Sequence, residues 1–227
     1  GYFGRCPKCG EFDTMVEHVE EDRKPAAQNR QVVGTSRAHP LRLSEISKEE
    51  ETRIAVPIEE FSRVLGGGLV PGSIVLLGGE PGVGKSTLVI ELSAMLANVI
   101  GPVLYVSGEE SSRQIKMRAD RLGLNAPDLY LLTETNLGNI FEQINQVDPA
   151  LVVIDSIQTT YAEELNSSPG LVSQVRECAI RLQTLAKSTG RSGLMIGHVT
   201  KDGSNACPRL LGTIVDTGLL HEGNSLH

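Results

Sequence analysis

The chain has no tryptophan, and its four tyrosines and four phenylalanines make up only 4% of its 227 residues. This scarcity argues against a surface that binds single strands by stacking nucleobases on aromatic rings. No apolar run approaches the roughly 20 residues that span a bilayer, and the first residues lack a charged-then-apolar secretory pattern. We therefore expect no membrane partner.

An excess of positive charge is also missing, because 21 Lys and Arg face 28 Asp and Glu, giving a net charge of −7. A wholly basic nucleic-acid coat is excluded, although a local basic groove is not. There are four cysteines, two of which, Cys6 and Cys9, form a tight C-x-x-C pair. This usage indicates a cytosolic chain with a metal clip rather than a disulfide framework. Structural zinc needs four ligands, so Cys6 and Cys9 make a partial site with His18 as a formal third ligand, or are two free thiols.

The amino-acid composition changes along the chain and divides it into three segments. Residues 1–16 are short and turn-rich, residues 17–54 are polar and charged like a linker, and the globular part begins near residue 55. From there, apolar runs alternate with amphipathic segments, which predicts a mostly parallel α/β sheet with helices on both faces. We expect strands at 73–78, 102–107, 129–132, 151–155, 194–199 and 215–220, and helices at 85–98, 111–122, 137–146 and 171–188.

A phosphate-binding loop follows the first of these strands. Residues 79–86 (GEPGVGKS) match G-x-x-x-x-G-K-[ST] in full and open a predicted helix, whose N-terminus attracts anions. Lys85 would reach the β- and γ-phosphates and Ser86 would ligate Mg²⁺. The alternative is a glycine-rich turn that only packs the strand on the helix. The expected nucleotide-binding residues are Gly79, Glu80, Pro81, Gly82, Val83, Gly84, Lys85, Ser86 and Thr87.

Two further strands end in acids. Asp155 closes the apolar run LVVID and is the candidate second Mg²⁺ ligand, unless it only caps a turn. Glu109 and Glu110 follow the strand at 102–107, and an acid there faces the γ-phosphate if this strand lies between the other two. Glu109 is then the water-orienting base, and Glu110 the less favoured neighbour. The alternative is two solvated acids in the first turn of a helix.

The chain resembles the RadA/Sms family of bacterial RecA-like ATPases in residues 61–87 (FSRVLGGGLVPGSIVLLGGEPGVGKST), 106–111 (VSGEES), 152–159 (VVIDSIQT) and 197–203 (GHVTKDG). Residues 4–17 (GRCPKCGEFDTMVE) are similar to the second half of that family's zinc finger. The resemblance implies a RecA-like P-loop NTPase core and a cytoplasmic protein, bacterial, or organellar if the source is a eukaryote. It also implies an ATP-dependent motor on single-stranded or branched DNA, acting as a ring hexamer in branch migration during homologous recombination and DNA repair, with a recombinase as a further partner.

The resemblance assigns roles to single residues. Glu109 falls on the catalytic glutamate and His198 near the γ-phosphate sensor, although a strand-end histidine with a purely structural hydrogen bond is the alternative. The loops at 163–170 and 201–205 would face DNA, the second with Lys201 and Arg209 nearby. Arg113, Lys116, Arg118 and Arg121 form a basic helix face, either solvated or a contact for a subunit or DNA.

The resemblance also divides the chain. Residues 1–16 become a partial zinc finger, 17–54 a linker, and 55–227 a RecA-like ATPase domain that is incomplete at its carboxy-terminal end. The family's first C-x-x-C, its Lys-Asn-Arg-Phe-Gly motif and its Lon-protease-like domain do not occur in these residues, so we expect slow turnover. Two alternatives stay open: a KaiC-type scaffold that binds ATP to form rings, and a chain that binds ATP with little hydrolysis.

Overall fold

The structure is a computed structural model that describes residues 42, 53–198 and 210–221. The chain divides into two units, Gly1–Ser47 and Lys48–His227, and the fold below is that of the second. The expected zinc-finger segment, with Cys6, Cys9 and His18, lies outside the described residues, as do Lys201 and Arg209.

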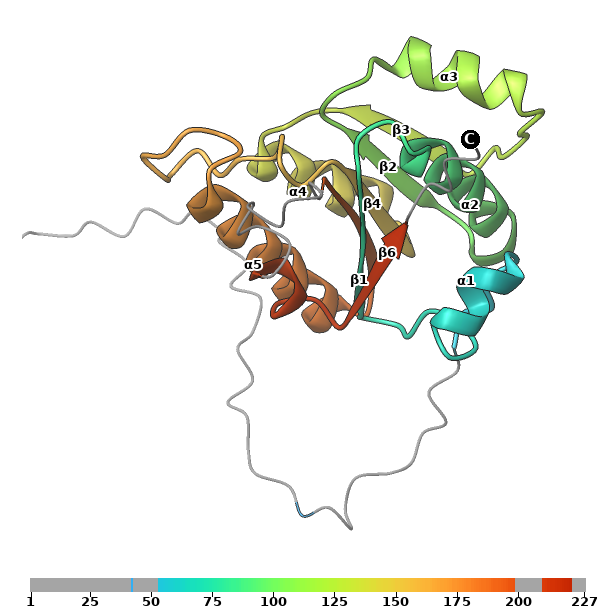
Figure 1. The fold of residues 1–227 in the computed structure, drawn as a ribbon, viewed down its shortest axis with the longest axis horizontal. Helices are drawn as coiled ribbons and strands as arrows, with labels where there is room; N and C mark the ends of the chain where they lie inside the picture. The colour runs from blue at the N-terminus through green and yellow to red at the C-terminus, as the bar shows by residue number, and fades with distance from the viewer. Residues whose placement is uncertain (1–41, 43–52, 199–209, 222–227) are drawn as a thin grey trace, which may run out of the picture. The chain divides into compact units, whose positions relative to one another are not determined.

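The described residues form a six-stranded sheet with the order β3-β2-β4-β5-β1-β6, in which every neighbouring pair is parallel (Figure 1). Strands β1, β2 and β4 are buried along their whole length, as expected where helices cover both faces of a parallel sheet. The strands are β1 (Ile74–Gly79), β2 (Val103–Ser107), β3 (Leu129–Thr133), β4 (Leu151–Asp155), β5 (Ser192–His198) and β6 (Thr217–His221).

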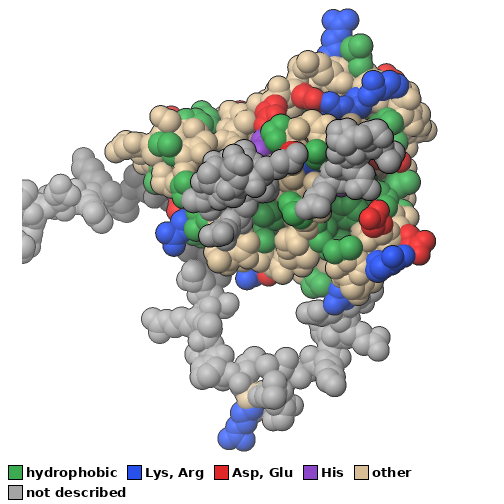
Figure 2. Space-filling model, in the orientation of Figure 1, with side chains coloured by type: hydrophobic (Ala, Val, Ile, Leu, Met, Phe, Trp, Pro, Cys, Tyr) green, Lys and Arg blue, Asp and Glu red, His purple; other side chains and the backbone are tan. Residues whose placement is uncertain are grey.

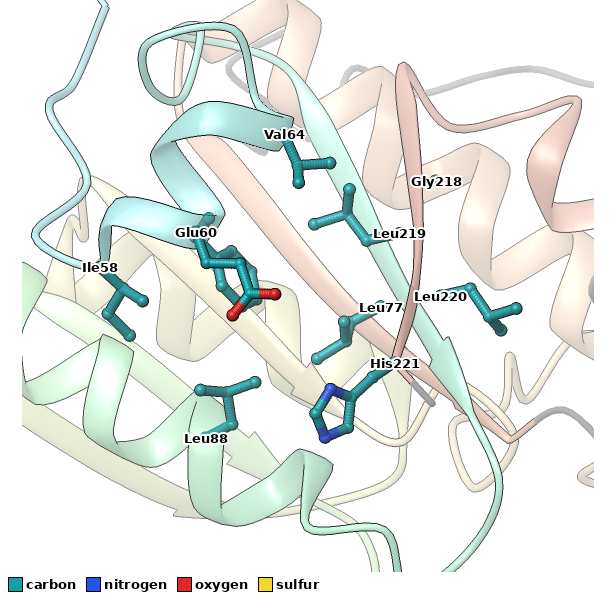
Figure 3. Close-up of a pocket in the computed structure, with 10 residues that line it drawn as sticks. Ile58, Glu60, Val64, Leu77, Leu88, Gly218, Leu219, Leu220 and His221 are labelled. Atoms are coloured by element: carbon teal, nitrogen blue, oxygen red, sulfur yellow. The ribbon is translucent and has the colours of Figure 1, made fainter. Parts of the chain in front are cut away.

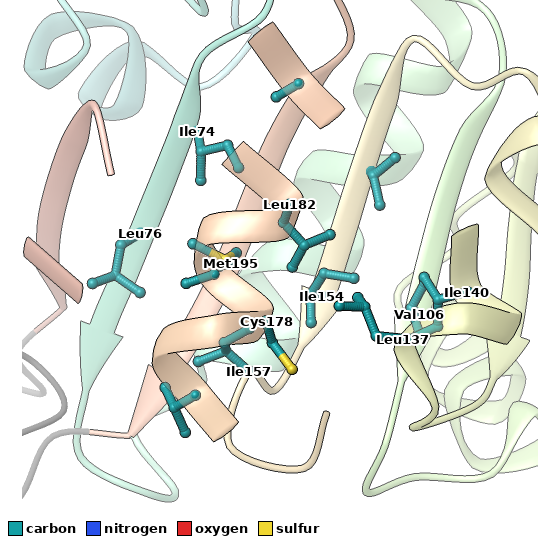
Figure 4. Close-up of a cluster of buried hydrophobic side chains, with 14 of the residues drawn as sticks. Ile74, Leu76, Val106, Leu137, Ile140, Ile154, Ile157, Cys178, Leu182 and Met195 are labelled. Atoms are coloured by element: carbon teal, nitrogen blue, oxygen red, sulfur yellow. The ribbon is translucent and has the colours of Figure 1, made fainter. Parts of the chain in front are cut away.

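Helices cover the two faces and create two hydrophobic cores. One core joins the sheet to α1, α2 and α3, and the other joins it to α4 and α5. Figure 4 shows the second core, where Ile140 of α4 and Cys178 and Leu182 of α5 lie against strand residues. The helices are α1 (Glu59–Val64), α2 (Lys85–Ile100), α3 (Ser112–Arg121), α4 (Leu137–Val147) and α5 (Val172–Thr189). In the part of the chain that the structure describes, no helix has both the length and the apolarity needed to cross a bilayer.

The predicted alternation of strands and helices is confirmed, with one difference in strand order. We expected the acid after β2 to face the phosphate site if β2 lay between the phosphate-loop strand and the Asp155 strand. Instead, β5 separates β1 from β4, and β2 lies on the outer side of β4. Local pattern cannot reveal this order, because it depends on which strands pair over long distances in sequence.

Candidate active site

The phosphate loop connects β1 to α2 in the predicted context. Gly84 is the N-cap of α2 and has a φ of 92°, a left-handed conformation that glycine adopts without steric cost. A Cβ at this position would meet no neighbouring atom, so backbone conformation rather than crowding favours glycine. The loop therefore ends at a helix N-terminus, where amide groups and the helix dipole favour a bound phosphate.

Lys85, the first residue of α2, is only 3% exposed. Its Nζ donates hydrogen bonds to the backbone carbonyl oxygens of Gly79, at 2.7 Å, and Glu80, at 2.6 Å. Burial lowers the pKa of Lys85, and the negative charges of Asp155 and Glu109 oppose that shift. Both acids are thus within electrostatic range of the lysine, so the sheet order places all three in one site.

Asp155 ends β4 and is 5% exposed. The hydroxyl of Tyr105 donates a hydrogen bond to its Oδ2 at 2.6 Å, and Ser86 adds a second hydrogen-bonding interaction. Burial raises the pKa of Asp155, while these two partners counteract the shift. A carboxylate and a hydroxyl side by side form an all-oxygen donor set, which is the kind that Mg²⁺ prefers. Ser86 and Asp155 therefore fit the ion that a P-loop nucleotide site requires.

The backbone after β2 passes unusually close to the segment after β4. The amide of Gly108 donates to the carbonyl oxygen of Asp155 at 2.8 Å. A Cβ at Gly108 would lie 2.1 Å from Oγ1 of Thr159, so only glycine fits there. This close approach carries the next residue, Glu109, over the end of β4.

Glu109 accepts two hydrogen bonds on the same oxygen, Oε1. Ser156 Oγ lies 2.8 Å away and His198 Nε2 lies 2.9 Å away, at the end of β5. Burial alone would raise the pKa of Glu109, but the hydrogen bonds from His198 and Ser156, with the electrostatic influence of His198 and Lys85, lower it. Glu109 therefore remains ionised, and the structure joins it directly to His198.

His198 is partly buried, with its side chain 28% exposed. Among the described residues its Nδ1 has no hydrogen-bond partner, and its backbone oxygen accepts a bond from Gln158 Nε2 at 3.3 Å. The imidazole thus links the end of β5 to the acid that follows β2.

Glu110 points to a different partner, which favours Glu109 as the site acid. It forms an ion pair with Arg118 of α3, whose side chain is only 18% exposed. Arg118 therefore does not share a solvated face with the other three basic residues of α3, for which a solvated face and a contact with a subunit or DNA were both open. Arg113, Lys116 and Arg121 are exposed, and Figure 2 shows Lys and Arg side chains gathered over this helix.

A cavity of about 650 Å³ lies between α1, α2 and the edge strand β6 (Figure 3). Its walls are mainly apolar, including Val64, Leu88 and Leu219. At one end of it His221 Nε2 lies 3.2 Å from the carbonyl oxygen of Val83, a phosphate-loop residue. The cavity therefore adjoins the loop but contains none of the acids described above.

The expected loop at 163–170 is described and is held in place by a buried glutamine. Gln174, 1% exposed, accepts from the amide of Ala162 and donates to the carbonyl oxygens of Ala162, Leu165 and Ser167. The loop is mostly exposed beyond these anchors. The second expected loop lies outside the described residues.

The zinc prediction receives no structural support. Within residues 53–198 and 210–221 no group of three or more His, Cys, Asp or Glu side chains could hold a metal ion. Cys178 is fully buried in the core on α5, and burial raises the pKa of its thiol to about 11. It is therefore a packing residue of the core.

Sequence reasoning missed two polar side chains of this site, Tyr105 and Ser156. A tyrosine inside an otherwise apolar buried strand signals a buried hydroxyl that needs a partner. The partner itself depends on strand register, which no local pattern supplies. Helix α1 was also missed, because it is only six residues long.

The chain is similar in sequence to a known domain family and to several curated proteins. An AAA-domain family matches residues 37–204. Three proteins named DNA repair protein RadA align over the whole chain: 47% identity over 226 residues in Halalkalibacterium halodurans, 48% over 230 in Bacillus subtilis and 46% over 226 in Listeria monocytogenes. The chain spans about half the length of these curated relatives, covering 50%, 50% and 49% of them.

A solved structure shares the fold. The KaiC-like protein of the hyperthermophilic archaeon Pyrococcus horikoshii aligns with a TM-score of 0.59 at 20% identity, covering 77% of this chain and 83% of that one. At this identity the similarity concerns the α/β architecture alone.

Proposed function

The chain belongs to the AAA-domain family and to the RadA/Sms family of RecA-like ATPases, and from this premise we propose that it is an ATP hydrolase stimulated by single-stranded DNA. We extend the proposal to its biological context, which is branch migration during recombination and repair by a homohexameric ring, because the relatives are named DNA repair proteins. A partner recombinase belongs to the same proposal.

One observation carries the ATPase proposal. A phosphate-loop lysine, a buried strand-end aspartate and an ionised glutamate converge at the carboxyl edge of one parallel sheet. The negative charges of Asp155 and Glu109 both act on the Lys85 ammonium group. The two acids have different hydrogen-bond partners, and the pKa of Asp155 is raised whereas that of Glu109 is lowered. Such a division between two nearby carboxylates is typical of sites in which each acid has its own task.

Binding of the nucleotide falls to the loop and the first turn of α2. Loop amides and the α2 N-terminus would hold the phosphates, and Lys85 would exchange its two carbonyl acceptors for phosphate oxygens. Bound Mg²⁺ supplies charge neutralisation at the phosphates, and the oxygens of Ser86 and Asp155 would hold it. Thr87 completes the set beside the helix start.

Glu109 would orient the attacking water. Because its pKa is lowered, it acts mainly as an ionised hydrogen-bond acceptor, and phosphoryl transfer depends more on such positioning than on proton removal. His198 Nε2 is hydrogen-bonded to Oε1 of Glu109. A γ-phosphate that took this imidazole as its own hydrogen-bond partner would therefore change the position of Glu109. This is how the site would sense hydrolysis.

The contacts to DNA would come from the loops after β4 and β5. The loop at 163–170 contains Glu163 and Glu164, which are poor partners for phosphates, so Lys201 and Arg209 are the better candidates. These contacts are electrostatic, and we expect the stimulation by DNA to decrease with added salt.

The test is ATP turnover of the 227-residue chain with and without single-stranded DNA. We expect slow turnover that DNA accelerates, and a loss of about 10²–10³-fold in Lys85→Ala, the effect of removing one stabilising donor. Lys187→Ala, at an exposed lysine of α5, is the matched control and should keep normal turnover.

Other outcomes would favour the alternatives. ATP binding with turnover that DNA leaves unchanged would contradict the motor function. Near-zero turnover with an ATP-dependent increase in mass would favour a ring-forming scaffold, and ATP binding with neither effect would favour a chain that only binds ATP.

A further inference from the structure

Tyr105 is a fully buried polar side chain of the sheet, 1% exposed in the middle of β2. It belongs to the same hydrophobic core as Ile115 of α3 and Val153 of β4. A tyrosine hydroxyl in such surroundings needs a hydrogen-bond partner, and here the partner is Asp155. The residue is thus a buried extension of the candidate Mg²⁺ site that no motif indicates.

Strand register explains the contact. Tyr105 pairs with Val153 across β2 and β4, so both side chains lie on the α2 face, and Asp155 follows two residues later on that face. Two residues of strand advance about 6.6 Å, a distance that a tyrosine side chain leaning along the strand can bridge. A phenylalanine would fill the same space without reaching the carboxylate.

The contact restricts the carboxylate. The separation of 2.6 Å is in the range of a hydrogen bond between a neutral hydroxyl and an ionised oxygen. With Oδ2 held in this way, the carboxylate of Asp155 cannot rotate without breaking the bond. Its orientation relative to Ser86, the second candidate ligand, is therefore fixed from the side of β2.

We propose that Tyr105 is a positioning residue for metal-dependent nucleotide binding, acting through Asp155. The inference rests on the proposed function, since it presumes that Asp155 and Ser86 hold Mg²⁺ with the nucleotide. Partners that orient metal ligands in other proteins contribute about 10–100-fold to metal affinity. The phenol contributes no ligand of its own.

The experiment compares Tyr105→Phe with Tyr130→Phe, a change at the exposed tyrosine of the neighbouring strand β3. Binding of a fluorescent, slowly hydrolysed ATP analogue is titrated with Mg²⁺ and repeated in EDTA. We expect Tyr105→Phe to need about tenfold more Mg²⁺ for half-maximal enhancement of binding, with unchanged affinity in EDTA. Tyr130→Phe should match the wild type in both.

A double-variant comparison separates positioning from general stability. In an Asp155→Asn background, adding Tyr105→Phe should cause no further loss of the Mg²⁺ effect, because the carboxylate that it orients is already absent. A further loss of the same size would overturn the inference, since the tyrosine would then act independently of Asp155.

Fluorine NMR gives a readout that does not need a folded Tyr105→Phe variant. Fluorotyrosine is placed at position 105 alone, and Mg²⁺ is added to the protein already bound to the ATP analogue. We expect the resonance to shift, and an unchanged resonance would overturn the inference. Equal Mg²⁺ requirements in wild type and Tyr105→Phe would overturn the inference about Tyr105 but not the proposed nucleotide site. If Mg²⁺ did not affect nucleotide binding by the wild type, the proposed site would be overturned as well.

Discussion

At the scale of single residues, the candidate site depends on how hydrogen bonds are shared at one glutamate oxygen. Ser156, 1% exposed, and His198 both bond Oε1 of Glu109. Of the two, Ser156 is the fixed partner, because it immediately follows the buried end of β4. His198 ends β5 and has a more exposed side chain, so we propose that it is the partner that a bound nucleotide displaces.

Replacing Ser156 by alanine tests this division. The variant removes one donor to Glu109, and hydrogen bonds to charged groups contribute about 1.5–3 kcal/mol, so turnover should fall at least about tenfold. KM for ATP should stay within about twofold, since Glu109 would orient water rather than hold the nucleotide. Steady-state kinetics measures both, with Ser173→Ala on α5 as control. A raised KM at normal kcat would contradict the role assigned to Ser156.

Part of this arrangement was predictable from sequence. The phosphate-loop string, Asp155 and Glu109 were predicted as site residues because each lies at or just after the end of a buried strand. The contact between Glu109 and His198 was not, because its members are 89 residues apart and meet only through strand order. Tyr105 was missed for a related reason: its partner is set by register, and a one-residue slip would turn it to the other face.

At the scale of elements, two helices begin at local capping signals in the sequence. Helix α3 begins where Ser111 and Gln114 form a capping box, and α4 begins where the Asn136 side chain accepts from Gly138 and Asn139 amides. Both signals lie in neighbouring residues, and each helix was predicted within one residue of its observed bounds. Helix α1 has no side-chain cap and buries Phe61 alone, so only its tertiary contacts stabilise it.

The turn between β3 and α4 contains a carboxylate whose effect on stability depends on pH. Glu134 accepts hydrogen bonds from the amides of Thr135 and Asn136 and from the Asn139 side chain. The Asn136 and Asn139 bonds, followed by the Thr135 bond, lower its pKa. The folded state therefore holds the proton less tightly than the unfolded state, so this stabilisation is complete above the ordinary pKa of 4.5 and is lost as pH falls below it.

Glu134→Gln should therefore destabilise the chain more at pH 7 than at pH 3. The group is near the surface and screened by solvent, so the expected loss at pH 7 is only about 0.5 kcal/mol. Urea unfolding at both values measures the difference, and Glu142→Gln, at an exposed position of α4, is the control. An equal loss at both values would show that the carboxylate charge does not matter.

At the scale of the whole molecule, parallel strands bring the candidate site residues to one edge of the sheet. The ends of β1, β2, β4 and β5 supply the phosphate loop, Glu109, Asp155 and His198 in turn. The role of Glu109 was made conditional on β2 lying between β1 and β4; this condition is not met, yet Glu109 still reaches the site. The reason is that the backbone after β2 passes close to the end of β4, where Gly108 donates to the carbonyl oxygen of Asp155. Strand β5, beside β4, then places His198 against Glu109.

Because the site joins four strands and the first turn of α2, a bound nucleotide should stabilise the whole domain. A ligand that binds only the folded state contributes about 2.7 kcal/mol at 100 times its Kd, which raises Tm by about 5–10 °C for a chain of this size. Thermal unfolding followed by circular dichroism, with and without a slowly hydrolysed MgATP analogue, measures this shift. Lys85→Ala should lose it and Lys187→Ala should keep it, each compared with its own ligand-free Tm. An equal shift in Lys85→Ala would mean that the nucleotide binds elsewhere, for example in the cavity beside β6, and that the convergence of Lys85 and Asp155 is not the nucleotide site.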